Sequence, residues 1–197
     1  MDKFIIFNLD DITTHKTDFY LFMCYQYLYT THQFFNFNSI TKSLTLITYL
    51  TREESYTVGA DKVGVSRQVW TQCIKTYPSI LTIIDTPSAF LNHNLFNEMA
   101  QKTADLGLKT KNFIWRIYGY LLFMDGRYGS KFQYSQEQMA KELDVSLKNL
   151  NKTLKQFVDW GWLEKKGKFK FSGEQTFSYI YQIPSRYKSE LKLRDEE

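Results

Sequence analysis

The sequence has little glycine, proline, cysteine or histidine: its 197 residues include nine, three, two and three of them, respectively. So few glycines and prolines leave long helices uninterrupted and exclude low-complexity linkers. Hydrophobic residues make up 43% of the chain and aromatic residues 17%. This is ample material for a packed core, which excludes intrinsic disorder, and the length suits one large domain or two small ones.

The rare cysteines and histidines form no recognisable site. Cys24 and Cys73 lie far apart between apolar neighbours, outside any CxxC or Cys/His spacing, so we expect buried, reduced thiols and neither zinc nor redox chemistry. His15, His32 and His93 lie in separate segments without a metal-ligand partner nearby in sequence. Glycine-rich phosphate loops and the GxSxG motif are also missing. The sequence therefore predicts a protein that is not an enzyme and that holds no metal and no cofactor.

Patterns of membrane insertion and secretion are equally scarce. The apolar stretch at 19–29 is interrupted by Gln26 and is too short to span a bilayer. The N-terminus lacks the basic, apolar and small-residue succession of a signal peptide. We therefore expect a cytoplasmic chain without a membrane partner. Its usage of Lys, Asn, Phe, Tyr and Ile indicates a low-GC bacterium or one of its mobile elements.

Periodicity and capping residues predict a mainly α chain with small β-hairpins, an α+β fold. In the first half, helices are expected at 18–30 and 39–50, a short one is capped by Thr57, and another runs from Ser66 to about residue 77. In the second half, helices are expected at 96–106 and 110–124, followed by a pair that starts at a capping box of Ser135 and Gln138. Strands are expected at 4–9, 81–85, 164–171 and 178–183.

Two segments of the chain, 56–81 and 134–163, align with each other at a constant offset of 80 residues. The shared pattern is A-x3-[GD]-V-S-x3-[WL]-x3-[IL], which is typical of a helix-turn-helix. In this alignment Ala60, Gly64, Val65, Ser66, Trp70 and Ile74 match Ala140, Asp144, Val145, Ser146, Leu150 and Leu154.

Each position of the pattern has a physical reason in two helices joined by a tight turn. The small alanine lets the helices approach closely, and Gly64 or Asp144 tolerates the left-handed conformation that the turn requires. Ser66 or Ser146 caps the second helix and leaves its first turn exposed. The large apolar residue that follows anchors the inner face of this helix. The exposed residues between these anchors can then enter the major groove of DNA.

A helix before each segment and a β-hairpin after it would make each half a winged helix. In the second copy the hairpin is expected at 164–183, and in the first copy at 81–91. The stretch from Ala140 to Leu163 resembles the winged-helix domains of bacterial regulators and phage replisome organisers, whose recurring pattern is AxxLxVSxxxLxxxLxxLxxxGWL. The pair resembles the tandem winged helices of plasmid replication initiators. This resemblance implies two winged-helix domains in tandem, at 1–90 and 110–185, with a connector at 91–109 and a charged tail at 186–197.

The candidate DNA-binding residues are the outward positions of the two second helices and the lysines of the second hairpin. Arg and Gln suit bidentate contacts with base edges, Asn can read adenine, and Lys holds phosphates. The net charge is only +4 and the pI is near 8.9, so binding to DNA requires that the positive charges cluster on one surface. The alternative is that these residues form the solvated polar face that any helix has. The candidates are Ser66, Arg67, Gln68, Thr71, Gln72 and Lys75 in the first copy, Ser146, Lys148, Asn149, Asn151, Lys152 and Lys155 in the second, and Lys165, Lys166, Lys168 and Lys170 in the hairpin.

Aromatic residues cluster ahead of the first repeat. They can stack on bases, but a core or an interface between halves or between subunits explains them more simply. The cluster is thus a candidate homodimer surface. Its members are Tyr20, Tyr25, Tyr27, Tyr29, Phe34, Phe35 and Phe37.

The sequence as a whole predicts a sequence-specific binder of double-stranded DNA that regulates transcription through two helix-turn-helix units. One alternative is a replication initiator of a plasmid or phage, since two such units stand in tandem. The other is a winged-helix module that contacts proteins and does not bind DNA.

Overall fold

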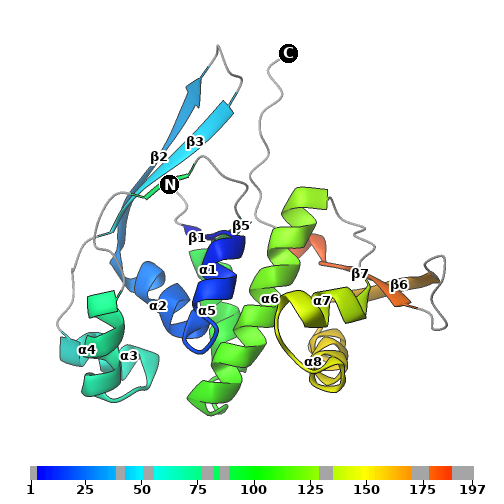
Figure 1. Cartoon of the computed structure of the whole chain (residues 1–197). Coiled ribbons are helices and arrows are strands. Elements are labelled where there is room, and N and C mark those ends of the chain that lie inside the picture. Colours follow the sequence, from blue (N-terminus) through cyan, green and yellow to red (C-terminus); the bar gives the residue numbers. More distant parts are fainter. Residues whose placement is uncertain are drawn as a thin grey trace. The chain divides into compact units, whose positions relative to one another are not determined.

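The computed structural model describes residues 4–38, 43–50, 56–76, 82–84, 89–128, 135–169 and 178–187, with the backbone alone at 29–38, 43–50, 82–84, 128, 178–179 and 187. The described chain is mainly helical with small antiparallel sheets, as the α+β prediction requires (Figure 1). It divides into two compact units, residues 1–116 and 117–197.

Unit 1 holds most of the strands. Its elements are β1 (Phe4–Phe7), α1 (Leu9–Thr14), α2 (Phe19–Tyr29), β2 (Thr30–Asn38), β3 (Ser43–Leu50), α3 (Tyr56–Val63), α4 (Arg67–Thr76), β4 (Thr82–Ile84), β5 (Ala89–Asn92), α5 (His93–Lys102) and the first part of α6 (Leu108–Tyr128). Unit 2 contains the rest of α6, then α7 (Gln136–Glu142), α8 (Leu147–Asp159), β6 (Glu164–Phe169), β7 (Ser178–Gln182) and a 3-10 turn at Ser185–Tyr187.

Helix α2 is the core helix of unit 1. It is buried on all sides from Phe19 to Gln26, as expected of a helix that is apolar around its whole circumference. The amide of Gln26 is satisfied by the backbone of Ile6, whose N–H donates to Oε1 at 2.9 Å and whose C=O accepts from Nε2 at 2.6 Å. Gln26 therefore joins α2 to β1, and it causes no break in the helix.

The polar residues of α6 in unit 1 satisfy the ends of other helices. Asn112 Oδ1 accepts from the N–H of Tyr20, in the first turn of α2, at 3.0 Å. Arg116 Nε donates to the C=O of Ile12, near the end of α1, at 3.0 Å. Both polar side chains are buried, and each pairs a backbone group that its own helix leaves without a partner.

The prediction of a helix at 39–50 is wrong over residues 43–50, which form the strand β3. Residues 39–42 lie outside the described part. Strand β3 pairs with β2 in antiparallel register, with Phe35 opposite Leu46 and Phe37 opposite Leu44, and β4 pairs with its other edge. The segment SLTLITYL contains three β-branched residues and an alternation that a strand satisfies as well as a helix would. The segment forms a strand because it pairs with β2 on one edge and with β4 on the other.

The wing expected at 81–91 in the first copy is also wrong. β4 belongs to the β2–β3–β4 sheet, whereas β5 pairs with β1, with Ile5 opposite Leu91. The two short strands therefore do not form a hairpin. The segment 91–109, expected to connect two domains, instead contains part of β5 and the whole of α5, which contributes the buried Phe96 and Met99 to unit 1. The two units divide inside α6.

In unit 2 an aromatic cluster forms the core. Tyr118 on α6, Phe157 on α8 and Trp162 ahead of β6 are almost completely buried, and their ring centroids lie 5.2–5.6 Å apart. The Tyr118 hydroxyl also donates to the C=O of Trp162 at 3.4 Å. Offset aromatic contacts of this kind stabilise beyond the area they bury, so the cluster fixes α8 against α6 and against the start of the hairpin.

The predicted state of the cysteines is confirmed, since Cys24 and Cys73 are both buried and neither forms a disulfide. Burial raises the pKa of the Cys24 thiol to about 12, so it stays protonated and unreactive at neutral pH.

Of the aromatic cluster ahead of the first repeat, Tyr20 and Tyr25 are core residues and Tyr27 packs on Phe96. The side chains of Tyr29, Phe34, Phe35 and Phe37 lie outside the described part. Among the helices described, none is long and apolar enough to cross a bilayer.

The packing of α3 on α4 gives a first testable prediction. A Cβ added at Gly59 would lie 2.3 Å from Nε1 of Trp70, a completely buried indole. We expect Gly59→Ala to destabilise unit 1 by about 1–3 kcal/mol through overpacking, although alanine is the better helix former. Urea denaturation measures the free energy of unfolding.

The second copy supplies the control for this prediction, because there Met139 stands in place of Gly59 and the smaller Leu150 in place of Trp70. In a Trp70→Leu background the cost of Gly59→Ala should therefore disappear. A stabilising Gly59→Ala in the otherwise unchanged chain, or equal effects in both backgrounds, would contradict the packing described.

Candidate nucleic-acid interface

The two segments that align in sequence fold alike. In each, a short helix (α3 or α7), a tight turn and a longer helix (α4 or α8) follow one another, and α4 and α8 begin exactly 80 residues apart, at Arg67 and Leu147. From 56 to 70 and from 136 to 150, every aligned residue has the same degree of burial. The internal repeat is therefore a structural repeat, with the same face of the second helix exposed in both copies.

The turns confirm the reason given for Gly64 and Asp144. Both have left-handed backbone angles, with φ of 73° and 52°. The N–H of the following valine donates to the C=O of the alanine five residues earlier, at 3.1 Å from Val65 to Ala60 and 2.9 Å from Val145 to Ala140. The N–H of residue 64 or 144 donates to the C=O three residues earlier, at 3.2 Å and 3.1 Å. These two bonds form a Schellman motif in each copy.

The serine caps are likewise equivalent. Ser66 Oγ accepts from the N–H of Val69, and Ser146 Oγ accepts from the N–H of Asn149, both at 3.3 Å. Each serine thereby satisfies one free N–H in the first turn of its helix. The expected capping box at Ser135 is not formed, because Ser135 occupies the cap position of α7 without a side-chain capping hydrogen bond.

Each helix pair rests on a preceding helix of its own unit. In unit 1 this is α2, which packs on both α3 and α4, rather than the helix expected at 39–50. In unit 2 it is α6, from which the Tyr120 hydroxyl donates to Glu142 Oε2 at 2.6 Å and Tyr118 packs on Phe157 of α8. The inner faces of α4 and α8 are held in this way, and their outer faces stay exposed.

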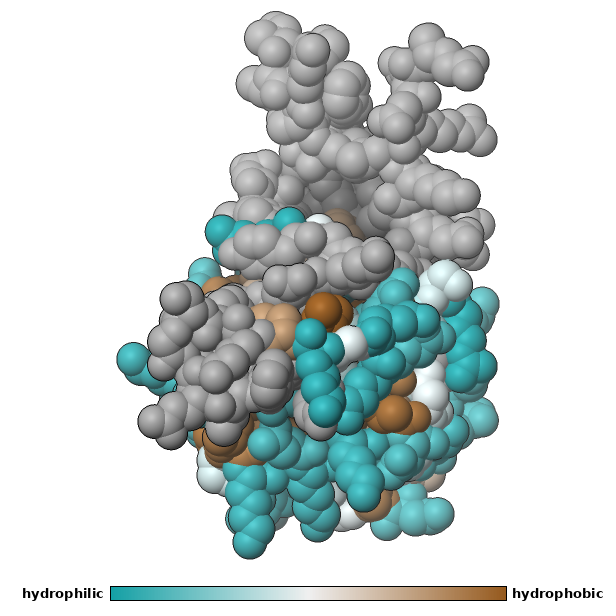
Figure 2. All heavy atoms as spheres, turned by 90° about the vertical axis from the view of Figure 1, so that its right-hand side faces the viewer, coloured by the Kyte–Doolittle hydropathy of each residue, from teal (hydrophilic) through white to brown (hydrophobic). Residues whose placement is uncertain are grey.

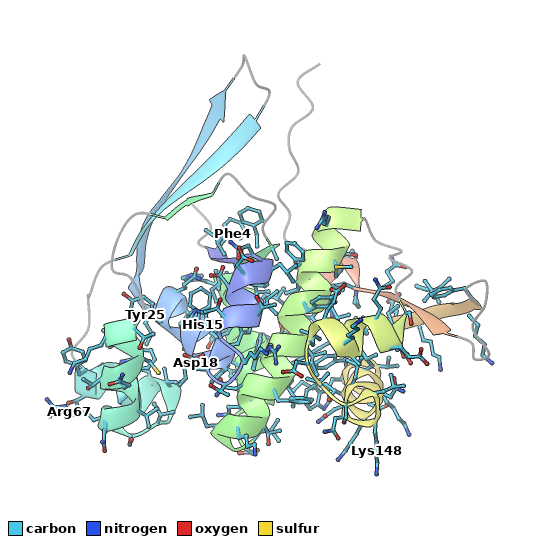
Figure 3. All side chains as sticks on the ribbon, in the orientation of Figure 1. Phe4, His15, Asp18, Tyr25, Arg67 and Lys148 are labelled. Atoms are coloured by element: carbon cyan, nitrogen blue, oxygen red, sulfur yellow. The ribbon has the colours of Figure 1, made fainter. Side chains whose placement is uncertain are left out.

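The predicted residues of α4 lie on its outer face. Ser66, Arg67, Gln68, Gln72 and Lys75 are exposed, and Thr71 is half-buried. Arg67 projects away from the body of its unit (Figure 3). The helix contains no acidic residue, so its exposed face presents two cations together with amides and hydroxyls.

The predicted residues of α8 are all exposed: Ser146, Lys148, Asn149, Asn151, Lys152 and Lys155. Lys148 projects outward in Figure 3. Asp159, at the C-terminal end, is the only acidic residue of this helix. Figure 2 looks onto the right-hand side of Figure 1, and the described surface there is predominantly hydrophilic, with hydrophobic side chains in separate spots.

The lysines of the β6–β7 hairpin are placed by an irregular strand register. A register irregularity at Lys166 places Lys165 opposite Tyr181 and Lys168 opposite Tyr179. Since directly paired residues share a face and successive positions alternate, Lys165 and Lys168 share one face. Lys166 instead makes an ion pair with Glu164. All three lysines are exposed, and Lys170 lies outside the described residues.

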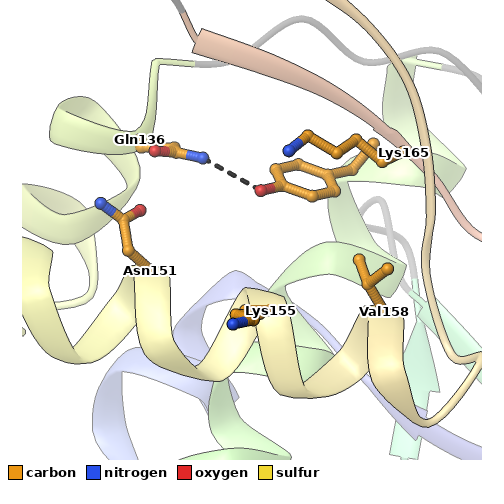
Figure 4. Close-up of a pocket in the computed structure, with 6 residues that line it drawn as sticks. Gln136, Asn151, Lys155, Val158 and Lys165 are labelled. Carbon is orange, nitrogen blue, oxygen red and sulfur yellow. Dashed lines mark hydrogen bonds between the residues drawn. The ribbon is translucent and has the colours of Figure 1, made fainter.

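A pocket of about 290 Å³ brings three of the predicted residues together. Asn151 and Lys155 of α8 and Lys165 of β6 line it, along with Gln136, Val158 and Tyr181 (Figure 4). The sequence did not indicate Gln136 and Tyr181, because nothing local places the start of α7 or the strand β7 beside α8, and Val158 is an apolar residue of α8. Sequence reasoning also missed Val69 and Leu147, which are 38% exposed in the first turns of α4 and α8, because apolar positions were assigned to the helix interior.

Comparison with known proteins finds no relative: no family model, no curated protein and no solved structure matches the chain significantly. Among the described residues, no group of three or more His, Cys, Asp or Glu side chains is placed to hold a metal ion. Unit 1 thus exposes the outer face of α4, and unit 2 exposes the outer face of α8 and the edge of the hairpin; these surfaces are rich in cations and amides.

The turn geometry gives a second prediction. Gly64 has open space around its Cα, so Gly64→Ala should destabilise unit 1 by about 1 kcal/mol solely through its left-handed backbone. Gly126 is the matched control, because it has equally open space but lies exposed within α6. There the same change should stabilise by about 0.5–1 kcal/mol. Thermal unfolding of the two variants would refute this assignment if both substitutions shifted the midpoint in the same direction.

Proposed function

We propose that the chain binds double-stranded DNA by placing the outer faces of α4 and α8 in the major groove. One observation carries this proposal: two helix-turn-helix units with equal turns, caps and burial each expose the outer face of their second helix. Helix α4 has no acidic residue, and α8 has none before Asp159 at its end. A polyanion attracts such surfaces, and a helix of this exposure fits the major groove. A binding role of this kind requires no catalytic group.

The two helices differ in how they would contact DNA. Arg67, Gln68 and Gln72 on α4 suit bidentate contacts with guanine and adenine edges. On α8, Lys148 and Lys152 suit phosphates, and Asn149 and Asn151 suit adenine. The exposed apolar residues Val69 and Leu147 lie beside these groups, where they can contact thymine methyl groups. Reading of sequence is thus assigned chiefly to α4 and backbone grip chiefly to α8.

Unit 2 supports a winged-helix assignment, because α6, α7, α8 and the β6–β7 hairpin follow in that order. Its hairpin would lie along the backbone or in the adjacent minor groove, with Lys165 and Lys168 on one face. For unit 1 we propose a helix-turn-helix that is supported by α2 and accompanied by the β2–β3–β4 sheet, since β4 and β5 do not form the expected wing.

The role that fits best is a sequence-specific transcriptional regulator of a bacterium or of its mobile element. Replication initiation is the second candidate, because two helix-turn-helix units in one chain suit two adjacent DNA sites. Selection of bound duplexes from a random library, followed by gel shifts with genomic and plasmid fragments, tests both. Sites at promoters favour regulation, and directly repeated sites at an origin favour initiation. If no sequence is preferred at moderate salt, the sequence-specific proposal is wrong.

The same experiments separate DNA binding from a module that contacts only proteins. Charge reversal at Lys152, Lys155 and Lys166 should abolish the gel shift if α8 and the hairpin hold DNA. A chain that gives no gel shift with any duplex, or only a weak shift that this triple reversal leaves unchanged, would favour the protein-binding alternative.

The division of labour between α4 and α8 gives a third prediction. Arg67→Ala should weaken binding to the preferred site by about 1–3 kcal/mol and relax its specificity. Lys152→Gln should weaken binding to all sequences and lower the slope of log K against log salt by about 1. Fluorescence anisotropy over a salt series measures both. Lys109→Gln, which removes the same charge from an exposed position on α6, is the control and should change neither. Equal effects from Arg67→Ala and Lys152→Gln would refute the division.

A further inference from the structure

The pocket beside α8 has a composition of its own. Its lining comes from three places in unit 2: the first residue of α7, one side of α8, and the paired strands β6 and β7. Figure 4 shows Asn151, Lys155 and Val158 along α8 on one side of the pocket and Lys165 on the opposite side. The pocket therefore separates the helix from the hairpin.

The polar groups of this pocket suit an anion. Two ammonium groups, of Lys155 and Lys165, two side-chain amides and one phenol line it, and none of the described lining residues carries a carboxylate. The phenol belongs to Tyr181, which is only 7% exposed, and its hydroxyl accepts a hydrogen bond from Gln136 Nε2 at 3.2 Å. This hydrogen bond fixes the inner wall between α7 and β7. The two lysines, by contrast, are exposed.

A phosphate group is the anion that matches this set best. Its several acceptor oxygens can take hydrogen bonds from ammonium and amide donors at once, and charge-assisted bonds of this type are the strong ones. The Tyr181 ring and Val158 add apolar surface, against which the sugar attached to a phosphate can lie.

The position of the pocket identifies which phosphate this would be. In duplex DNA one sugar–phosphate strand separates the major groove from the adjacent minor groove. A helix in the major groove and a hairpin in that minor groove must therefore lie on either side of this strand. We infer that the pocket between α8 and the β6–β7 hairpin binds one phosphate group of the strand that passes between them. This inference rests on the proposed function, and its chemistry also admits a free phosphate monoester.

Neutral phosphates test the inference directly. The probe is a series of duplexes carrying the selected site, each with a single uncharged methylphosphonate at a different position. For the unaltered chain we expect several positions to weaken binding, and the position whose phosphate occupies the pocket to lower affinity at least about tenfold, as loss of a charge-assisted contact does. In the double variant Lys155→Gln/Lys165→Gln this position should become indistinguishable from its neighbours. In the matched double variant Lys148→Gln/Lys152→Gln, which removes the same charge from the same unit, it should keep its full effect.

The outcomes separate this inference from the proposed function. If duplex DNA is bound but the methylphosphonate profile is the same in both double variants, the phosphate site is refuted and DNA binding stands. If duplex DNA is not bound, titration with inorganic phosphate and with a nucleoside monophosphate, followed by NMR, tests the free source. Shifts at Lys155, Lys165 and Asn151 would then support a free-phosphate site, and no shift would refute the pocket as well. Thermal midpoints equal to that of the unaltered chain show that both double variants retain the fold.

Discussion

The left-handed residue that ends a helix is the constraint on which the candidate interface depends. At Gly64 and at Asp144 it turns the chain so that the next valine bonds back to the alanine five residues earlier. A third left-handed residue, Gly161, ends α8 in the same way, and there Trp162 donates to the C=O of Phe157 at 2.8 Å and packs on its ring. These turns set the direction of each following element, and they thereby decide which side of α4 and α8 faces solvent.

Within this common geometry the two copies carry different side chains. The helix crossing in unit 1 combines Gly59 with a large indole, whereas unit 2 combines Met139 with a leucine. The outer faces differ as well, with arginine and glutamines on α4 and lysines and asparagines on α8. Core and outer face thus differ between the two copies, although the turn geometry is the same in both.

Features set by neighbouring residues could be predicted from the sequence, and features set by distant pairing could not. The turns, both serine caps and the exposed faces follow from contacts within about a dozen residues. Strand β3 does not, because its pattern suits a helix or a strand and only β2 and β4 decide. The same holds for β4 and β5, which pair with strands far away in sequence, and for the irregularity at Lys166, which the partner strand creates. The pocket beside α8 was missed for this reason.

Binding of duplex DNA through the outer faces of α4 and α8 can be followed residue by residue in an NMR titration of the whole chain with a duplex that carries its selected site. We expect the largest amide shifts at residues 66–75, 146–155 and 164–168 and smaller shifts at the buried inner positions. Shifts concentrated on other elements such as α5, or none at a duplex concentration that saturates the gel shift, would contradict this binding mode.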